Sequence, residues 1–160
     1  MATLLGNTLP PPLLERLQAG AAYRGGGLGA VVISVDNVGL PHCAVANCAV
    51  AAGAAAVYVP LGAGSSSERN LRRDGRCTLL LAGPGWLYYV KGSATVARER
   101  LACFPAESAV RVAVSAVYSD SEEYFSVVSG LTYRLIREVE QVAALERAII
   151  DELTELAAAG

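Results

Sequence analysis

Alternation of apolar and polar side chains dominates the middle of the chain and predicts a mainly β protein. Six segments are rich in β-branched residues or alternate with a period of two: 30–35, 40–52, 56–61, 76–82, 86–98 and 109–118. Turn sequences such as Asp36–Gly39 and Gly83–Gly85 separate several of them. We expect six antiparallel strands joined by short turns.

Two of these segments alternate cleanly enough to assign faces. One face of segment 86–98 is predicted to carry Trp86, Tyr88, Val90, Ala94 and Val96. Its opposite face is predicted to carry Tyr89, Lys91, Ser93 and Thr95. In segment 109–118 the same period groups Val110, Val112, Val114 and Tyr118.

Helical signals occur at three places. Prolines at 10–12 and Gly20 bracket a short amphipathic helix near the N-terminus. Ser65 followed by Glu68 is a capping-box pattern, which predicts a helix that ends at Asp74-Gly75. Apolar residues at helical spacing predict a C-terminal helix over about 141–158. Segment 131–138 is compatible with a strand or with the start of that helix.

Together these elements predict a single α+β domain over residues 1–160. Its centre would be a small six-stranded antiparallel barrel, with a short N-terminal helix, an inserted helix and a C-terminal helix around it. A chain of 160 residues is long enough for one domain with a real core and too short for two ordinary ones.

Charge and composition exclude several classes of protein. The net charge is -2, from 13 basic and 15 acidic residues, and this argues against a nucleic-acid binder because phosphate neutralisation needs a basic surplus. The N-terminus is a poor secretory signal, and the alanine-rich stretch 43–61 does not resemble a membrane span. The four cysteines form no C-x-x-C pair. We therefore expect a cytoplasmic protein with reduced, mostly buried thiols and no metal site.

Covalent catalysis has little support in the sequence. His42 is the sole histidine, and no serine lies in a G-x-S-x-G elbow. Strand alternation separates Cys43 from His42 and Cys48, which argues against metal binding there. An enzyme that uses the thiol of Cys43 or Cys48 stays an open alternative, but no catalytic acid or base is assigned.

The richest cluster of polar side chains is the start of the inserted helix. Unpaired backbone N–H groups at a helix N-terminus, three serine hydroxyls and the Arg69 guanidinium are suited to binding a phosphate. The competing interpretation is that Ser65 and Glu68 only cap the helix while the arginines are solvated. Lys91, the single lysine, is a second candidate because its strand follows the serine-rich turn.

The order of these motifs resembles a known family. Residues 36–42 resemble its D-x-x-G-x-P-H opening, residues 65–71 its S-x-K/R-x-x-N-L turn, and residues 89–94 its v-x-G-x-A strand. These are features of the pyridoxamine 5′-phosphate oxidase-like, FMN-binding split-barrel family, and the resemblance covers residues 10–118. The arginine-rich C-terminal end of the oxidase itself is absent, so oxidation of pyridoxamine phosphate is not expected.

The resemblance implies a cofactor, a partner and a site. It implies a homodimer of six-stranded split barrels that holds FMN between subunits, and a flavin-dependent oxidoreductase whose small-molecule substrate is unknown. The phosphate contacts that it implies are Ser65, Ser66, Ser67, Arg69 and Asn70, with Lys91 as a second contact. Some relatives use a deazaflavin or haem, or bind nothing. The alternative is therefore a dimer without FMN that acts as a ligand-binding module.

Overall fold

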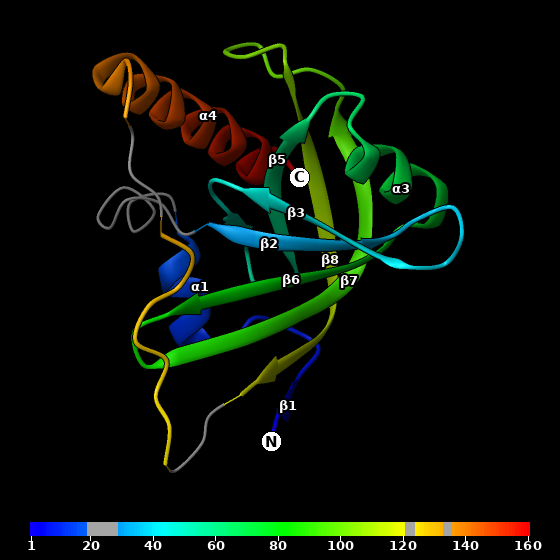
Figure 1. Ribbon diagram of the computed structural model, residues 1–160, viewed down its shortest axis with the longest axis vertical. Coiled ribbons are helices and arrows are strands. Elements are labelled where there is room, and N and C mark those ends of the chain that lie inside the picture. The colour runs from blue at the N-terminus through cyan, green and yellow to red at the C-terminus, as the bar shows by residue number, and fades with distance from the viewer. Residues whose placement is uncertain (19–28, 121–123, 133–135) are drawn as a thin grey trace.

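The computed structural model describes residues 1–18, 29–120, 124–132 and 136–160 (Figure 1). Its elements in chain order are β1 (Thr3–Gly6), α1 (Pro11–Leu17), β2 (Ala30–Val35), β3 (Pro41–Ala46), β4 (Val50–Ala52), β5 (Ala56–Gly62), α3 (Ser66–Asp74), β6 (Arg76–Gly83), β7 (Trp86–Arg98), β8 (Glu107–Ser119) and α4 (Val139–Ala159). The predicted stop of the first helix at Gly20 lies outside the described residues. None of the helices described here is both long and apolar enough to cross a membrane.

One antiparallel sheet contains every described strand. Its order is β3-β2-β6-β7-β8-β5-β4, and β1 pairs with the end of β8 that β5 leaves free. The two 13-residue strands β7 and β8 pair along most of their length and join the two halves of the sheet. The mainly antiparallel α+β fold is confirmed, but the sheet has eight strands and is not closed into a six-stranded barrel.

The two extra strands have simple origins. Strand β1 was missed because it is a four-residue, largely exposed segment without alternation. The predicted strand 40–52 is two strands, because β3 pairs with β2 whereas β4 pairs with β5. The break falls at residues 47–49, where the chain passes from one half of the sheet to the other.

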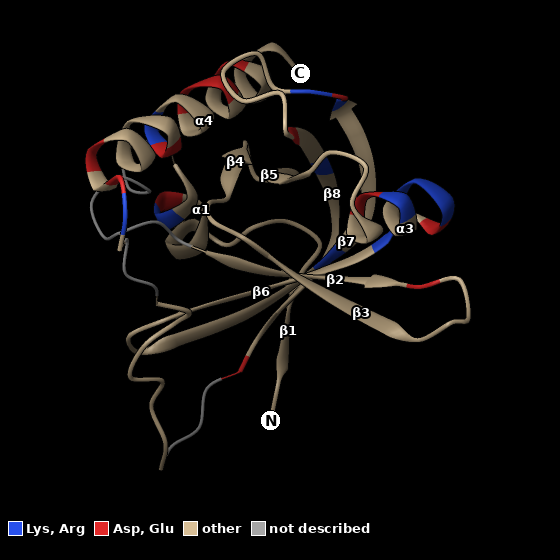
Figure 2. Ribbon diagram, turned by 45° about the horizontal axis from the view of Figure 1, so that its top comes forward, with Lys and Arg blue, Asp and Glu red and all other residues tan. Residues whose placement is uncertain are grey.

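Inward-facing side chains of the sheet form the main core. Leu79, Leu81 and Val90 pack there with Leu13 of α1 and Leu71 of α3. In Figure 2, α1 and α4 lie above strands β2, β3 and β6, and no described helix lies below these strands. The opposite face of this half of the sheet is therefore free of helices within the described chain.

A second apolar cluster attaches the C-terminal helix. Ile149, Ile150 and Leu153 of α4 pack on Val50 of β4 and Tyr58 of β5. Each fully buried aliphatic side chain of this kind contributes about 1.5–3 kcal/mol of transfer free energy. The predicted apolar stripe of the helix thus covers the edge of the sheet.

Glu152 adds a polar anchor to α4. Its carboxylate accepts hydrogen bonds from Ala102 N (2.8 Å), Cys103 N (3.0 Å) and Arg98 Nη1 (2.5 Å), all on the β7–β8 connection or beside it. Burial alone raises the pKa of Glu152, but these hydrogen bonds outweigh burial and lower the pKa to about 2. The charged carboxylate is therefore the form that holds the helix in place.

A β-bulge in β8 corrects one assignment of faces. Lys91 lies opposite Ala116 while the next residue, Gly92, lies opposite Val114, so Ser115 is an extra residue on β8. The extra residue reverses the alternation beyond it. Val117 is buried, and Tyr118, which the period of two had grouped with Val112, faces the helix-free side of the sheet.

Gly92 allows the two long strands to come together at this bulge. A Cβ built at Gly92 would lie 2.1 Å from the carbonyl oxygen of Ala113. A backbone atom cannot swing aside as a flexible side chain does, so any larger residue would push the strands apart.

We expect Gly92→Ala to lower the free energy of unfolding by about 2 kcal/mol or more, the cost of overpacking a site that cannot relax. Urea denaturation measures this change. Gly62→Ala is the matched control, because its new Cβ would meet only Ser65 Cβ at 3.6 Å. Equal stabilities of the two variants would contradict the close approach seen at the bulge.

Glu152→Gln should be less stable than the wild type by about 2 kcal/mol at neutral pH, because it loses charge-assisted hydrogen bonds. Since the folded pKa lies below the ordinary value of 4.5, the deficit is fully present above about pH 4.5 and shrinks as the pH falls towards 2. Urea denaturation over this pH range tests it, with exposed Glu155→Gln as control. A deficit that is equally large near pH 3 would show that the pKa of Glu152 is not lowered by these hydrogen bonds.

Candidate functional site

The start of α3 is where the sequence predicts a phosphate site. The Ser65 hydroxyl accepts a hydrogen bond from Glu68 N at 3.3 Å, and the Glu68 carboxylate accepts one from Gly64 N. This is a capping arrangement, in which a carboxylate of the helix itself satisfies one of the free backbone donors. The predicted helix and its cap are both confirmed. The cap takes up one backbone donor of this terminus, the N–H of Glu68.

Partners within the chain also hold Ser66, Arg69 and Asn70. Arg69 donates from Nη1 to Gly64 O and from Nη2 to Ser66 Oγ. Ser67 and Asn70 are 4% and 6% exposed, and Asn70 Nδ2 donates to Ser34 Oγ at 3.4 Å. In the S-x-K/R-x-x-N-L pattern the basic residue stands three positions before the asparagine, where this chain has Ser67. The assignment of these residues to a phosphate stays a prediction.

The helix-free face of the sheet holds the second predicted candidate, Lys91. Two shallow cavities of about 330 and 360 Å³ adjoin there, and both are lined by Thr78 and Lys91. Arg76, Gly92 and Ser115 also line the first cavity, and Tyr89 and Tyr118 line the second. We call the two cavities together the outer groove. Volumes of this size are typical of small-molecule sites.

Cross-strand register builds the outer groove from four strands. Ile33 of β2 lies opposite Thr78 of β6, which lies opposite Lys91 of β7, which lies opposite Ala116 of β8. Because directly opposite residues of paired strands lie on one face of a sheet, all of these point to the same face. The bulge adds the side chain of Ser115, whose hydroxyl donates to Lys91 O at 3.1 Å.

The outer groove has a surplus of positive charge. Lys91 Nζ lies 5.0 Å from the centroid of the Tyr118 ring, a cation–π distance, and has no carboxylate partner among the described residues. Arg76 is paired on one side, with Nε and Nη2 donating to Asp74 at 2.5 and 2.7 Å. Hydrogen bonds from Arg76 lower the pKa of Asp74 to about 2. No carboxylate lines either cavity.

Tyr89 adds a fixed hydroxyl at the far end of the groove. Its Oη donates to Asp120 Oδ2 at 3.1 Å. Partial burial and the neighbouring Asp120 carboxylate raise the pKa of Tyr89, so the phenol keeps its proton at neutral pH.

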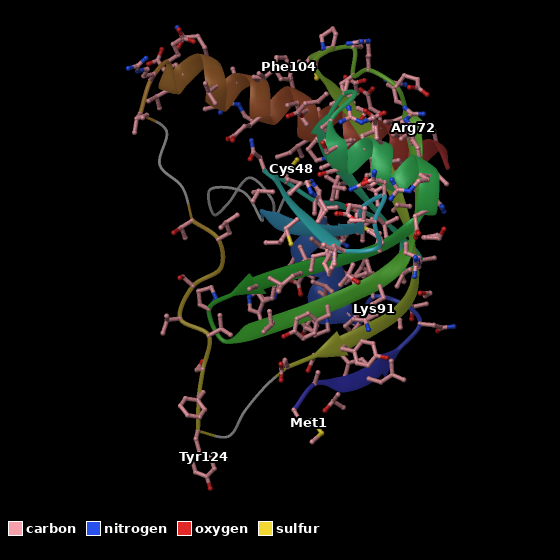
Figure 3. All side chains as sticks on the ribbon, turned by 45° about the vertical axis from the view of Figure 1, so that its right-hand side comes forward. Met1, Cys48, Arg72, Lys91, Phe104 and Tyr124 are labelled. Carbon is pink, nitrogen blue, oxygen red and sulfur yellow. The ribbon has the colours of Figure 1, made fainter. Side chains whose placement is uncertain are left out.

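The structure therefore separates the two predicted sets of residues. None of the predicted α3 residues, Ser65 to Asn70, lines either cavity. Figure 3 shows Arg72 of α3 and Lys91 of β7 at separate places on the molecule. The residues that do gather around Lys91 are Arg76, Thr78, Ser115 and Tyr118, which the sequence had not marked as site residues. Strand register brings them together, and no short motif encodes it.

Two of the four cysteines are poorly suited to catalysis. Cys48 and Cys77 are buried, as expected, but Cys43 and Cys103 are exposed. Burial raises the pKa of Cys48 and of Cys77 to about 12, so both are thiols at neutral pH. Within the described ranges, no three His, Cys, Asp or Glu side chains cluster as metal ligands do.

Comparison with solved structures identifies the fold. A Lactobacillus delbrueckii protein named provisionally as a pyridoxamine 5′-phosphate oxidase superposes with a TM-score of 0.56 at 16% identity, over 73% of this chain and 98% of that one. The chain has the pyridoxamine 5′-phosphate oxidase-like fold. The resemblance found in the sequence is thus confirmed at the level of the fold.

Two further proteins of this fold carry names that mention a ligand. An FMN-binding protein of Syntrophomonas wolfei matches with a TM-score of 0.54 at 11% identity, covering 69% of this chain and 88% of its own. A heme binding protein of Mycobacterium smegmatis matches with a TM-score of 0.51 at 12% identity, covering 69% of this chain and 56% of its own. No protein-family model and no curated protein matches the chain. At these identities the likeness shows the fold alone.

Proposed function

We propose that the chain binds FMN in the outer groove and serves as a flavin-dependent oxidoreductase with a small-molecule substrate. The observation that carries this proposal is the placement of Lys91, a cation without a carboxylate partner among the described residues, in a groove that no carboxylate lines. A compensating anion is the ligand that such a groove fits best. The FMN-binding protein among the structures of this fold supports the choice of cofactor.

The residues of the groove fit the two ends of FMN. Lys91 and Arg76 offer positive charge to a phosphate, and Thr78 offers a hydroxyl. The rings of Tyr89 and Tyr118 offer flat apolar surface to an isoalloxazine ring. Gly92, at the bulge, also lines the first cavity.

The chain itself would bind and orient, and the cofactor would supply hydride or electron transfer. Tyr118 would fix the position of a ring by stacking, and the sheet behind it would exclude water from one side. Tyr89 keeps its proton at neutral pH and donates it to Asp120, so its hydroxyl oxygen is left to a ligand as an acceptor. No described residue of the groove is assigned as a base.

The same face of the sheet supports the proposal that the protein is a homodimer. A row of apolar side chains crosses six strands in register: Val45, Val31, Leu80, Tyr89, Tyr118 and Leu4. Val45 and Leu4 are 52% and 58% exposed, and no described helix covers this row. A continuous apolar face of this kind is typical of an interaction surface. A second copy placed here would cover the open groove.

The segment that follows β8 presents further exposed apolar side chains. Tyr124, Phe125 and Val128 are each about four-fifths exposed, while Gly85 N donates to Val127 O at 2.7 Å and ties the segment to the β6–β7 turn. Tyr124 points away from the sheet in Figure 3. Contact with a second subunit would bury these aromatic rings.

The absorption spectrum of the purified chain tests the cofactor. We expect a flavin band near roughly 450 nm that reductant bleaches, or its appearance when FMN is added to colourless protein. Colourless protein that ignores added FMN would refute the proposal and favour the ligand-binding module. A haem or deazaflavin spectrum would show that the chain binds that cofactor in place of FMN. A screen of nicotinamide donors on the loaded protein then tests the oxidoreductase activity.

Light scattering tests the dimer. Val45→Glu places a charge in the apolar row, so we expect it to convert a dimer of about 33 kDa, twice the 16.6 kDa chain, into monomers. Val139→Glu is the matched control, since Val139 is also 52% exposed but begins α4. A wild-type monomer would refute the homodimer, and a Val45→Glu dimer would place the interface elsewhere.

A further inference from the structure

Two apolar patches lie exposed at opposite ends of the helix-free face. The first consists of residues 37–40, which connect β2 to β3, and its largest apolar side chains are those of Val38 and Leu40. We call it the hairpin tip. The second is the segment 124–132, which we call the strap, and its most exposed apolar side chains are Tyr124, Phe125 and Val128. Apolar side chains that gather in this way are typical of an interaction surface, whereas isolated ones are not.

Strand β2 separates the two patches. The hairpin tip follows closely on Val35, the last residue of β2. At the other end of the strand, a Cβ built on Gly29 would lie 3.8 Å from Leu131 Cδ2 of the strap. Six residues of strand span about 20 Å, so the patches stand at opposite ends of the sheet along the strand direction. Figure 1 shows the β2–β3 turn and the strap on opposite sides of the molecule, and in Figure 2 the strap descends on the helix-free side of the sheet.

The hairpin tip is held in shape by the residue before it. Asp36 Oδ1 accepts hydrogen bonds from Val38 N at 2.9 Å and from Leu40 N at 2.8 Å, so its carboxylate is used within the turn. Residues 37–40 themselves carry no charge. Their apolar side chains are therefore presented on a fixed turn, and a partner can cover them without burying an unpaired charge.

The strap is fastened to the end of the β6–β7 hairpin. Gly85 N donates to Val127 O at 2.7 Å. Gly130 approaches β6 so closely that a Cβ built on it would lie 2.0 Å from Ala82 O. None of residues 124–132 is charged. Both patches are thus fixed and uncharged, which lowers the entropic cost of bringing them together.

Twofold symmetry can bring the two patches together. In an isologous dimer each contact forms twice, so a hairpin tip that meets the partner's strap implies the reverse contact as well. The second copy must then face the apolar row with its strands reversed in direction. The alternative places like patches together, but two straps that both descend from the sheet at one end would compete for the same space.

We propose that the strap of each subunit packs on the hairpin tip of its partner, and that these paired contacts set the orientation of the dimer. This inference rests on the proposed function, because it names the surface that the exposed strap of the proposed homodimer covers. Gly39 of the hairpin tip also lines the first cavity, so the partner's strap lies at the rim of the outer groove. Each subunit therefore contributes an edge to the groove of the other.

Exchange of charges across the contact, measured by sedimentation of the full-length chain, tests the inference. Leu40→Lys and Phe125→Glu each put an uncompensated charge into the apolar contact, so each variant should dimerise at least about tenfold more weakly than the wild type. The double variant Leu40→Lys/Phe125→Glu places the two charges opposite each other in the dimer, and its dimerisation should return to within about threefold of the wild type. High salt should weaken this recovery.

Leu40→Lys/Val139→Glu is the matched control, because Val139 begins α4 and lies in neither patch, so its dimer should stay weak. Single variants with wild-type dimerisation would overturn the inference, as would a double variant that dimerises no better than Leu40→Lys. A preferred dimer between Leu40→Lys and Leu40→Glu chains would show that like patches meet, which also overturns it. In each of these cases a monomeric Val45→Glu chain would leave the proposed homodimer intact, whereas a monomeric wild type would overturn both. All substituted side chains are exposed, and circular dichroism checks that the variants fold.

Discussion

The pairing of β7 with β8 is the interaction on which the rest of the structure depends. These two strands carry β6 on one side and both β5 and β1 on the other, so each half of the sheet is attached through them. Their contact tightens at Gly92, where the backbone of β8 leaves no room for a Cβ. The bulge beside it turns Tyr118 outward and brings Ser115 to the groove. A constraint of backbone packing thus creates the surface that we assign to the cofactor.

Two helices, α3 and α4, are attached to the sheet away from the groove. The second apolar cluster and Glu152 fasten α4 to the sheet edge, away from the groove. The α3 helix is held by its own cap and by buried Asn70 and Leu71. Neither helix covers the face that carries the apolar row, and this explains how a small domain can keep one side of its sheet for a partner or a cofactor.

The sequence predicts most of the elements but little of the site. Strand β7 and the Ser65 cap follow from local patterns, and both were placed correctly because alternation and capping act over a few residues. Tyr118 was assigned to the wrong face, since an inserted residue reverses the alternation without leaving a mark in composition. The break between β3 and β4 lies in an alanine-rich stretch where Asn47 is the single turn-forming residue. The groove depends on register between distant strands, so only Lys91 of its residues was foreseen.

A crystal structure of the full-length chain grown with FMN tests the central claim most directly. The account predicts flavin density on the helix-free face of the sheet, with a phosphate oxygen within hydrogen-bond distance of Lys91 Nζ and the ring beside Tyr118. It also predicts a second copy against the row that contains Val45 and Leu80. Flavin density at the start of α3, or a saturated crystal with an empty groove, would contradict it.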